Sequence, residues 1–333
     1  MLSLEPMRQR DHTIDLLRGL SILQVIYMHV TPYFGSLPMS AWVTNWGQAV
    51  VPILLYCSLS VFKPITNLSL QSYLSVGYKR IRRLIVPYYI FLILYIVLTW
   101  ALGKPMSAQD FLLNLTVTGG ISYNWLVLLF IILGCMIPWF QHAYENHRRM
   151  WIFVYVITAL AEIWALYNRA YIGPSYRTWM LLLWIPFIPT FQIIGELRTR
   201  APKKLFFLAL SLAATFYILY LAISSTSMSL HMTPHKYPPD IYYFLYSIAV
   251  VASVIWVTPL LARLLPRSVS SVVNYCSRIS YELYFAHILV LTLLDVSFPR
   301  RDIAPALFTG LVFGGSFVLV WIGQRIMNQI RPS

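Results

Sequence analysis

Charged side chains are scarce in this sequence. Asp, Glu, Lys and Arg make up 11% of the 333 residues, and only 11 residues are acidic. About a quarter of the residues of an average soluble domain are charged, so this composition excludes an ordinary water-soluble fold. Cysteine is also rare: Cys57, Cys135 and Cys276 all lie in or beside apolar segments. We therefore expect neither a disulfide framework nor a Cys-rich metal site.

The common motifs of soluble enzymes are missing as well. The sequence has no Gly-rich phosphate loop, no metal-ligand spacing and no serine nucleophile elbow, so we expect no metal cofactor. No small-residue cleavage site follows the first apolar stretch. We therefore expect the first helix to remain as a membrane anchor.

Long apolar runs dominate what is present. Hydrophobic residues make up 59% of the chain, and we count about ten runs that are long enough to cross roughly 30 Å of hydrocarbon. The sequence thus predicts an all-α, polytopic integral membrane helix bundle that forms one domain over residues 1–333. The expected spans are residues 14–33, 46–62, 84–102, 123–140, 151–168, 178–195, 205–223, 241–262, 281–296 and 304–327.

The distribution of Lys and Arg predicts the orientation, because short cytoplasmic loops carry an excess of both. With the N-terminus inside, most of the 25 Lys and Arg residues fall on the cytoplasmic side, and both termini are predicted to be cytoplasmic. The formal net charge of +14 does not indicate nucleic acid, since the basic residues alternate with apolar runs; membrane lipids are the expected neighbours. Six basic residues would lie outside: Lys104, Arg169, Arg177, Lys236, Arg300 and Arg301.

The first span carries Asp15, Arg18 and His29 into the membrane. Ionisable side chains at bilayer depth cost several kcal/mol each, so they usually face a protein interior or a wet cavity and mark a function. About 1100° of helical rotation separates Arg18 from His29, so they share one face, roughly 16 Å apart along the axis. Asp15, one turn before Arg18, is placed to orient its guanidinium. This arrangement suits a long substrate with an anionic head.

His29 fits two interpretations. A neutral imidazole in a low-dielectric site can act as a general base or a nucleophile. The alternative is a buried histidine that is hydrogen-bonded to a neighbouring helix.

Four basic residues, Lys79, Arg80, Arg82 and Arg83, stand just before the third span, at its expected cytoplasmic entrance. Guanidinium groups bind phosphate in a bidentate manner, so the cluster could hold a nucleotide-bearing donor whose tail reaches into the bundle. It also fits a stop-transfer cluster that contacts anionic lipid.

Three other spans also carry polar or aromatic residues that could serve a site. Glu282 and His287 in the ninth span diverge by roughly 140° around the helix, and His287 fits either packing against another helix or chemistry. Glu162 and Arg169 lie on nearly the same face of the fifth span, which favours an internal ion pair. Trp125 opens the fourth span near the outer surface, either as part of an aromatic belt or as the floor of a sugar site.

The outer loop at residues 230–240 is rich in proline. Pro234, Pro238 and Pro239 each fix φ and lack a backbone donor. We therefore expect this loop to be stiff and extended rather than helical.

The first span also carries a family motif. Residues 14–20, with ten residues between Arg18 and His29, resemble the Arg-X10-His first-helix motif of the acyltransferase 3 family of membrane O-acyltransferases. Four weaker similarities follow in the family's order, with Leu59 in place of a glycine after Ser58. They are residues 51–58, residues 80–87, residues 124–126, which resemble a Trp-Phe-Leu region, and residues 280–287, which resemble a Ser-x-x-x-Tyr-x-x-His pattern.

The resemblance implies transfer of an acyl group, usually acetyl from cytoplasmic acetyl-CoA, to a hydroxyl of a cell-envelope glycan or glycolipid at the bacterial inner membrane. It makes His29 the catalytic residue, as base or as acyl carrier, and Arg18 a group that orients the donor or stabilises developing charge. CoA phosphates would bind at Arg80, Arg82 and Arg83, with Asp15, Trp125, Glu282 and His287 in support. The alternative is a polytopic transporter or glycan translocase, which also needs buried ionisable groups.

Overall fold

The structure is a computed structural model that describes residues 11–34, 38–62, 69–298 and 304–330, and within these ranges it contains helices and loops but no strand. The predicted all-α class is confirmed. Six residues that enter the orientation prediction, Arg8, Arg10, Lys63, Arg300, Arg301 and Arg331, lie outside the described residues. The α-helices and 3₁₀ helices (η) are α1 (His12–Val30), η1 (Thr31–Phe34), α2 (Pro38–Trp46), α3 (Val50–Ser60), α4 (Leu70–Ala101), α5 (Ala108–Leu115), η2 (Ser122–Asn124), α6 (Trp125–Asn146), α7 (Arg148–Tyr167), α8 (Arg169–Ile172), η3 (Gly173–Ser175), α9 (Tyr176–Trp184), α10 (Phe187–Arg200), α11 (Pro202–Ser224), α12 (Met232–Lys236), α13 (Ile241–Leu264), α14 (Arg267–Arg278), α15 (Ser280–Ser297) and α16 (Pro305–Ile330).

The described chain contains fewer complete spans than the apolar runs predict. Six helices, in α4, α6, α7, α11, α13 and α16, are long and apolar enough to cross a membrane. Two bent pairs raise the number to eight: α8 to α9 with α10, bent by 41°, and α14 with α15, bent by 82°. The expected count of about ten is therefore not confirmed. Length alone cannot reveal that an apolar run breaks within the bundle.

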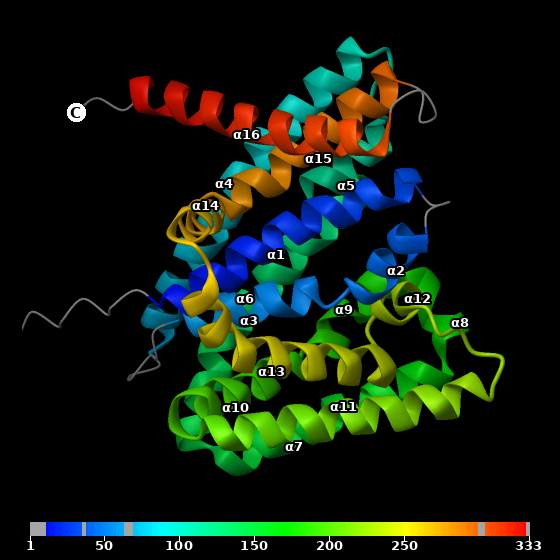
Figure 1. Ribbon diagram of the computed structural model, residues 1–333, viewed down its shortest axis with the longest axis vertical. Helices are drawn as coiled ribbons and strands as arrows, with labels where there is room; N and C mark the ends of the chain where they lie inside the picture. The colour runs from blue at the N-terminus through cyan, green and yellow to red at the C-terminus, as the bar shows by residue number, and fades with distance from the viewer. Residues whose placement is uncertain (1–10, 35–37, 63–68, 299–303, 331–333) are drawn as a thin grey trace, which may run out of the picture.

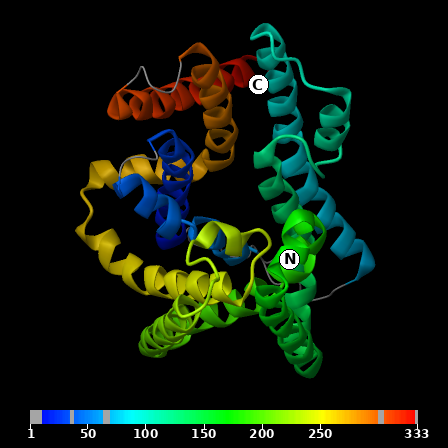
Figure 2. The ribbon, with the colours of Figure 1, turned by 90° about the vertical axis from the view of Figure 1, so that its right-hand side faces the viewer.

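The first span lies in the middle of the bundle (Figure 1). Helix α1 packs against α3, α13, α14, α15 and α16, and its apolar residues such as Ile22 and Ile26 are buried. In both views α16 lies at one end of the long axis, and α7 and α11 at the other (Figure 2). Because protein surrounds much of α1, its polar residues meet protein groups rather than lipid tails, which lowers their cost.

Gly19 allows α1 and α14 to approach closely. A Cβ added at Gly19 would stand 2.1 Å from the carbonyl oxygen of Val273, so one backbone would have to move. We expect Gly19→Ala to destabilise the protein by about 1–3 kcal/mol, because overpacking forces the two helices apart. Thermal unfolding in detergent measures this effect.

Gly310→Ala in α16 is the matched control. Nothing lies within 4 Å of its added Cβ, so we expect a neutral or slightly stabilising effect from the better helix propensity of alanine. Equal melting temperatures for the Gly19 and Gly310 variants would contradict close packing at Gly19.

The second predicted span, residues 46–62, contains a turn followed by one short helix. A turn at residues 47–49 separates α2 from α3, and α3 has only 11 residues. At about 1.5 Å per residue, α3 covers roughly 16 Å, too little to cross a bilayer alone. Its buried residues, among them Leu55 and Tyr56, show that it fills the interior of the bundle.

The third predicted span begins earlier than expected. Helix α4 has 32 residues and starts at Leu70, where the Ser69 side chain caps it by accepting a hydrogen bond from the backbone N–H of Ser72. The basic cluster of residues 79–83 therefore lies inside α4 and not at its entrance. The apolar run alone places the start too late, because a helix can continue beyond the hydrocarbon with polar residues on its surface.

Candidate functional site

The two histidines from the first and ninth spans meet. His29 Nδ1 lies 2.7 Å from His287 Nε2, and the two rings lie edge to edge, nearly parallel, with centroids 5.0 Å apart. His287 is fully buried, on α15. The contact joins the C-terminal end of α1 to α15, across a sequence separation that no local pattern reveals.

The hydrogen bonds around this pair assign its protons. His287 Nδ1 lies 3.1 Å from the carbonyl oxygen of Leu283, and a carbonyl only accepts, so His287 Nδ1 carries a proton. A neutral His287 then accepts at Nε2, and His29 Nδ1 must donate to it. We infer that His29 Nε2 holds a free lone pair, which is the form that a general base requires.

Tyr123 covers the His29 ring. Their ring centroids are 4.8 Å apart, and the Tyr284 hydroxyl donates to the Tyr123 carbonyl at 2.7 Å. Tyr284 also packs edge-on against His287. Tyrosines from η2 and α15 thus enclose the histidine pair, so few orientations are open to its rings.

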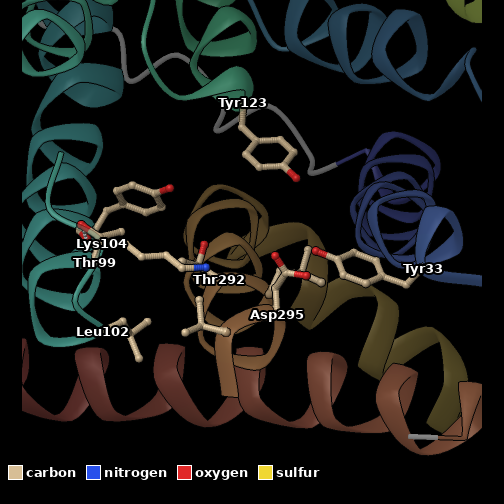
Figure 3. Close-up of a pocket in the computed structure, with 10 residues that line it drawn as sticks. Tyr33, Thr99, Leu102, Lys104, Tyr123, Thr292 and Asp295 are labelled. Carbon is tan, nitrogen blue, oxygen red and sulfur yellow. Dashed lines mark hydrogen bonds between the residues drawn. The ribbon is translucent and has the colours of Figure 1, made fainter. Parts of the chain in front are cut away.

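A cavity of about 370 Å³ lies near the C-terminal end of α1 (Figure 3). Tyr123 contacts His29 and also lines the cavity. Hydroxyl groups, one ammonium, one carboxylate and three aliphatic side chains line the rest, and the polar groups suit a polyhydroxylated ligand. The lining residues come from η1, α4 and the segment just after it, η2, and α15: Tyr33, Tyr95, Thr99, Leu102, Lys104, Tyr123, Leu291, Thr292, Asp295 and Val296.

At the other end of α1, two guanidinium groups converge on α3. Arg18 Nη2 donates to the Cys57 carbonyl at 3.2 Å, and Arg80 Nη2 donates to the Ser58 hydroxyl at 2.7 Å. Asp15 accepts a hydrogen bond from Ser277 of α14. The two like charges lie close enough to repel each other. Two guanidinium groups at this spacing have the chemistry to bind an anion.

The three arginines of the basic cluster differ in exposure. Arg80 is half-buried, its Nε has no partner among the described residues, and it packs so tightly on Gly134 that an added Cβ there would stand 2.0 Å away. Arg82 and Arg83 are exposed. Arg80 therefore belongs to the helix contact between α4 and α6, whereas Arg82 and Arg83 face the surroundings.

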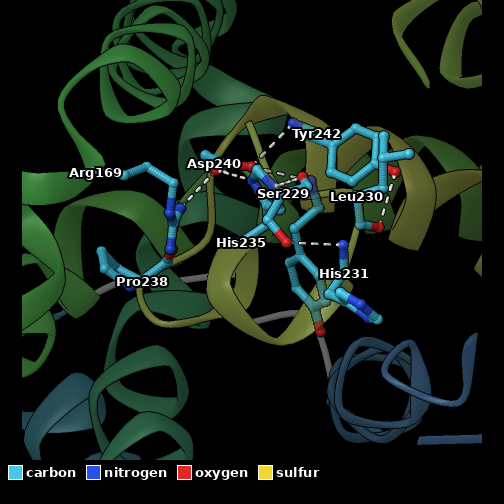
Figure 4. A network of polar contacts seen from close by, with 9 residues as sticks. Arg169, Ser229, Leu230, His231, His235, Pro238, Asp240 and Tyr242 are labelled. Carbon is cyan, nitrogen blue, oxygen red and sulfur yellow. Dashed lines mark hydrogen bonds and ion pairs between the residues drawn. The ribbon is translucent and has the colours of Figure 1, made fainter. Parts of the chain in front are cut away.

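The proline-rich outer loop is compact and partly helical, which corrects the expectation of an extended loop. Residues 232–236 form α12. The buried carboxylate of Asp240 organises the loop: it accepts from Arg169 Nη1 at 2.5 Å and contacts His235 Nδ1 at 2.6 Å (Figure 4). Asp240 also caps α13 by accepting from two backbone N–H groups. These bonds outweigh the extended preference of the prolines.

Arg169 and Glu162 do not form the expected ion pair. Arg169 pairs with Asp240 instead, and both carboxylate oxygens of the buried Glu162 lack a partner among the described residues. Helix α7 ends at Tyr167 and a new helix begins at Arg169, so the helix that carries Glu162 is interrupted before it reaches Arg169. Because of this interruption, Glu162 and Arg169 do not lie on one face of a continuous helix, as the prediction assumed.

Trp125 takes part in the outer loop's packing. Its ring meets Tyr237 edge-on at 5.0 Å, and the Lys236 ammonium lies 5.2 Å from the Trp125 ring centre. Lys236 is buried and donates to Gln48 Oε1 at 2.9 Å. Burial lowers the pKa of Lys236 to about 7.

The two polar residues predicted on the ninth span differ in exposure. Glu282 is exposed on α15, while His287 on the same helix is buried.

Sequence reasoning did not single out the contact between Lys236 and Gln48. Lys236 enters the sequence argument only as an outer basic residue in a proline-rich loop. The available signal was an ammonium beside an aromatic residue on the predicted outer side, which is weak alone. Among the described residues, no group of three or more His, Cys, Asp and Glu could hold a metal ion.

Comparison with known proteins supplies one match. A family model described as an acyltransferase domain, Acyl_transf_3, matches residues 11–325, which is nearly the whole chain. No curated protein and no solved structure matches the chain.

Proposed function

We propose, from the premise that this chain belongs to the acyltransferase 3 family, that it carries an acetyl group from cytoplasmic acetyl-CoA to a hydroxyl of a cell-envelope glycan. The family and the apolar helices establish a membrane acyltransferase. The acetyl donor, the glycan acceptor and a place in the bacterial inner membrane are our proposal. The matched family does not favour the transporter alternative.

One observation carries the proposal: Tyr123 connects the His29–His287 pair to the hydroxyl-lined cavity, because it contacts His29 and also lines the cavity. A glycan hydroxyl in this cavity would approach His29 past Tyr123. His29 Nε2 would accept the hydroxyl proton while the oxygen attacks the thioester carbonyl. The same lone pair is also what an acyl-histidine route would need, with His29 as the nucleophile; we propose direct transfer because it needs a single acyl-transfer step.

Geometry at the two ends of α1 supports opposite approaches of the two substrates. The beginning of α1 and the end of α16 lie on one side of the bundle, and α2, α8 and α12 lie on the other with the end of α1 (Figure 1). Arg18 and Arg80 stand near the former side and His29 near the latter. A donor bound by its phosphates at the arginines would extend its pantetheine arm along α1 toward His29.

Arg83 tests the donor side. Because its exposed guanidinium would meet CoA phosphate, Arg83→Ala should raise KM for acetyl-CoA roughly tenfold and leave kcat nearly unchanged. Arg149→Ala removes an exposed arginine at the start of α7 and is the matched control. An unchanged KM in the Arg83 variant would remove Arg83 from the donor site.

The function as a whole is tested on cells. Mass spectrometry of envelope polysaccharides, with and without this gene, should show acetyl esters that depend on the gene. Complementation with the wild-type gene should restore them, and with the His29→Ala gene should not. Identical polysaccharides in the two strains would reject a glycan acceptor.

A further inference from the structure

Lys236 is a buried cation without a carboxylate. It is 4% exposed, and among the described residues no acidic side chain pairs with it. The nearest acid in sequence, Asp240, is occupied by Arg169 and His235. Burying an unpaired charge costs several kcal/mol, so such a residue is retained for a reason other than stability.

The partners of Lys236 favour its charged form and leave donors free. Gln48 Oε1 accepts one hydrogen bond at 2.9 Å, and the rings of Trp125 and Tyr237 lie 5.2 and 5.1 Å from Nζ. Ring faces attract a cation and not a neutral amine. An ammonium has three N–H donors, and Gln48 is the one hydrogen-bond acceptor found for it in the described chain.

Lys236 lies in the same region of the bundle as His29. Its charge acts on the His29 ring through space, and the segment from Tyr123 to Trp125 contacts both residues, His29 through Tyr123 and Lys236 through Trp125. The cation therefore adjoins the region where the acceptor hydroxyl would meet the thioester.

We propose that Lys236 is a catalytic residue of the acyl transfer, whose ammonium donates to the thioester carbonyl oxygen and stabilises the oxyanion that forms there. This inference rests on the proposed function. A fixed donor aimed at an oxyanion in a water-poor site stabilises the transition state more than the ground state.

The step balances as follows. The acceptor oxygen bonds to the thioester carbonyl carbon as its proton passes to His29 Nε2, and the carbonyl π electrons move to the oxygen beside Lys236. When the carbonyl re-forms, the carbon–sulfur bond breaks. The CoA thiolate then takes the proton from His29, leaving an ester, a free thiol and a neutral histidine.

The test uses inside-out membrane vesicles that contain the full-length protein, radiolabelled acetyl-CoA, and the vesicles' own envelope glycans as acceptor. Lys236→Met keeps the apolar stem on the two rings but removes the charge. We expect kcat to fall roughly 100- to 1,000-fold with little change in KM for acetyl-CoA. Lys236→Arg should recover part of the rate. Lys203→Met, at an exposed position of α11, is the matched control.

A pH profile separates catalysis from a structural role. The titratable groups around Lys236 are His29 from α1, Tyr123 from η2, Tyr237 beside it, and Tyr243 of α13, which donates to the Gln48 carbonyl. Burial raises the pKa of Tyr237, so a loss of rate as pH rises through about 7 reports Lys236. Gln48→Glu places a carboxylate beside the ammonium and should move this limb upward by about 1–3 pH units.

The outcomes are distinguishable. Wild-type kcat in Lys236→Met, or an alkaline limb that Gln48→Glu does not move, overturns the role of Lys236 and leaves the proposed function standing. Absence of transfer by the wild-type protein overturns both.

Discussion

Replacing His29 by alanine is expected to lower kcat for acetyl transfer by roughly 10²–10⁴-fold. Among the described residues, His29 is the one histidine of the pair with a ring nitrogen that makes no hydrogen bond, because His287 uses Nδ1 on the Leu283 carbonyl and Nε2 on His29. Without this base the acceptor hydroxyl would have to attack with its proton in place. Initial rates of the purified protein, at saturating acetyl-CoA, measure the loss.

His12→Ala is the control for this experiment. His12 begins the same helix and is exposed, so its removal should leave the rate unchanged. Both variants should melt near the wild-type temperature, because His29 contributes one hydrogen bond to the core. Turnover by a folded His29→Ala protein at the wild-type rate would show that the reaction uses another base.

Residues within one helix were predictable from the sequence. The spacing of Arg18 and His29 on α1 follows from helical geometry alone, and α1 does carry both. The ninth predicted span, residues 281–296, matches α15 within one residue at each end. In these cases a long apolar run and a fixed rotation per residue decide the structure.

Contacts between distant segments were not predictable. The meeting of His29 with His287 depends on how α1 packs against α15, and the burial of Lys236 depends on the Asp240 bonds that hold α12 against Arg169. The same limit explains the span count. The bend of 82° between α14 and α15 follows from tertiary packing, and an apolar run looks the same whether or not it bends.

The hydrogen bonds of Asp240 also explain why the proline content wrongly predicted an extended loop at residues 230–240. Prolines restrict φ but do not forbid one turn of helix. A buried carboxylate that accepts charged and backbone donors contributes more than this local preference, since hydrogen bonds to charged groups contribute about 1.5–3 kcal/mol each. The hydrogen bonds of Asp240 therefore determine the conformation of the loop. In this conformation Lys236 is buried in the bundle.

His287→Phe is expected to lower kcat roughly 100-fold and to leave KM for acetyl-CoA nearly unchanged, because a group that orients a reacting histidine contributes about that much. His287 Nε2 fixes which nitrogen of His29 carries the proton. A phenyl ring fills the same buried space but accepts no hydrogen bond. The proton of His29 would then no longer be held on Nδ1, and Nε2 would not be kept unprotonated. Steady-state rates over a range of acetyl-CoA concentrations measure both constants.

His287→Gln distinguishes orientation from packing. Its Oε1 can stand near the position of His287 Nε2 and accept from His29 Nδ1, so the rate should stay within about tenfold of wild type. Phe fills the site at least as well as Gln but cannot accept, so packing alone predicts the opposite order of rates. A His287→Phe protein as active as His287→Gln would show that the acceptor nitrogen is dispensable. The two variants thus test whether the proposed mechanism depends on the hydrogen bond between the two histidines or only on their proximity.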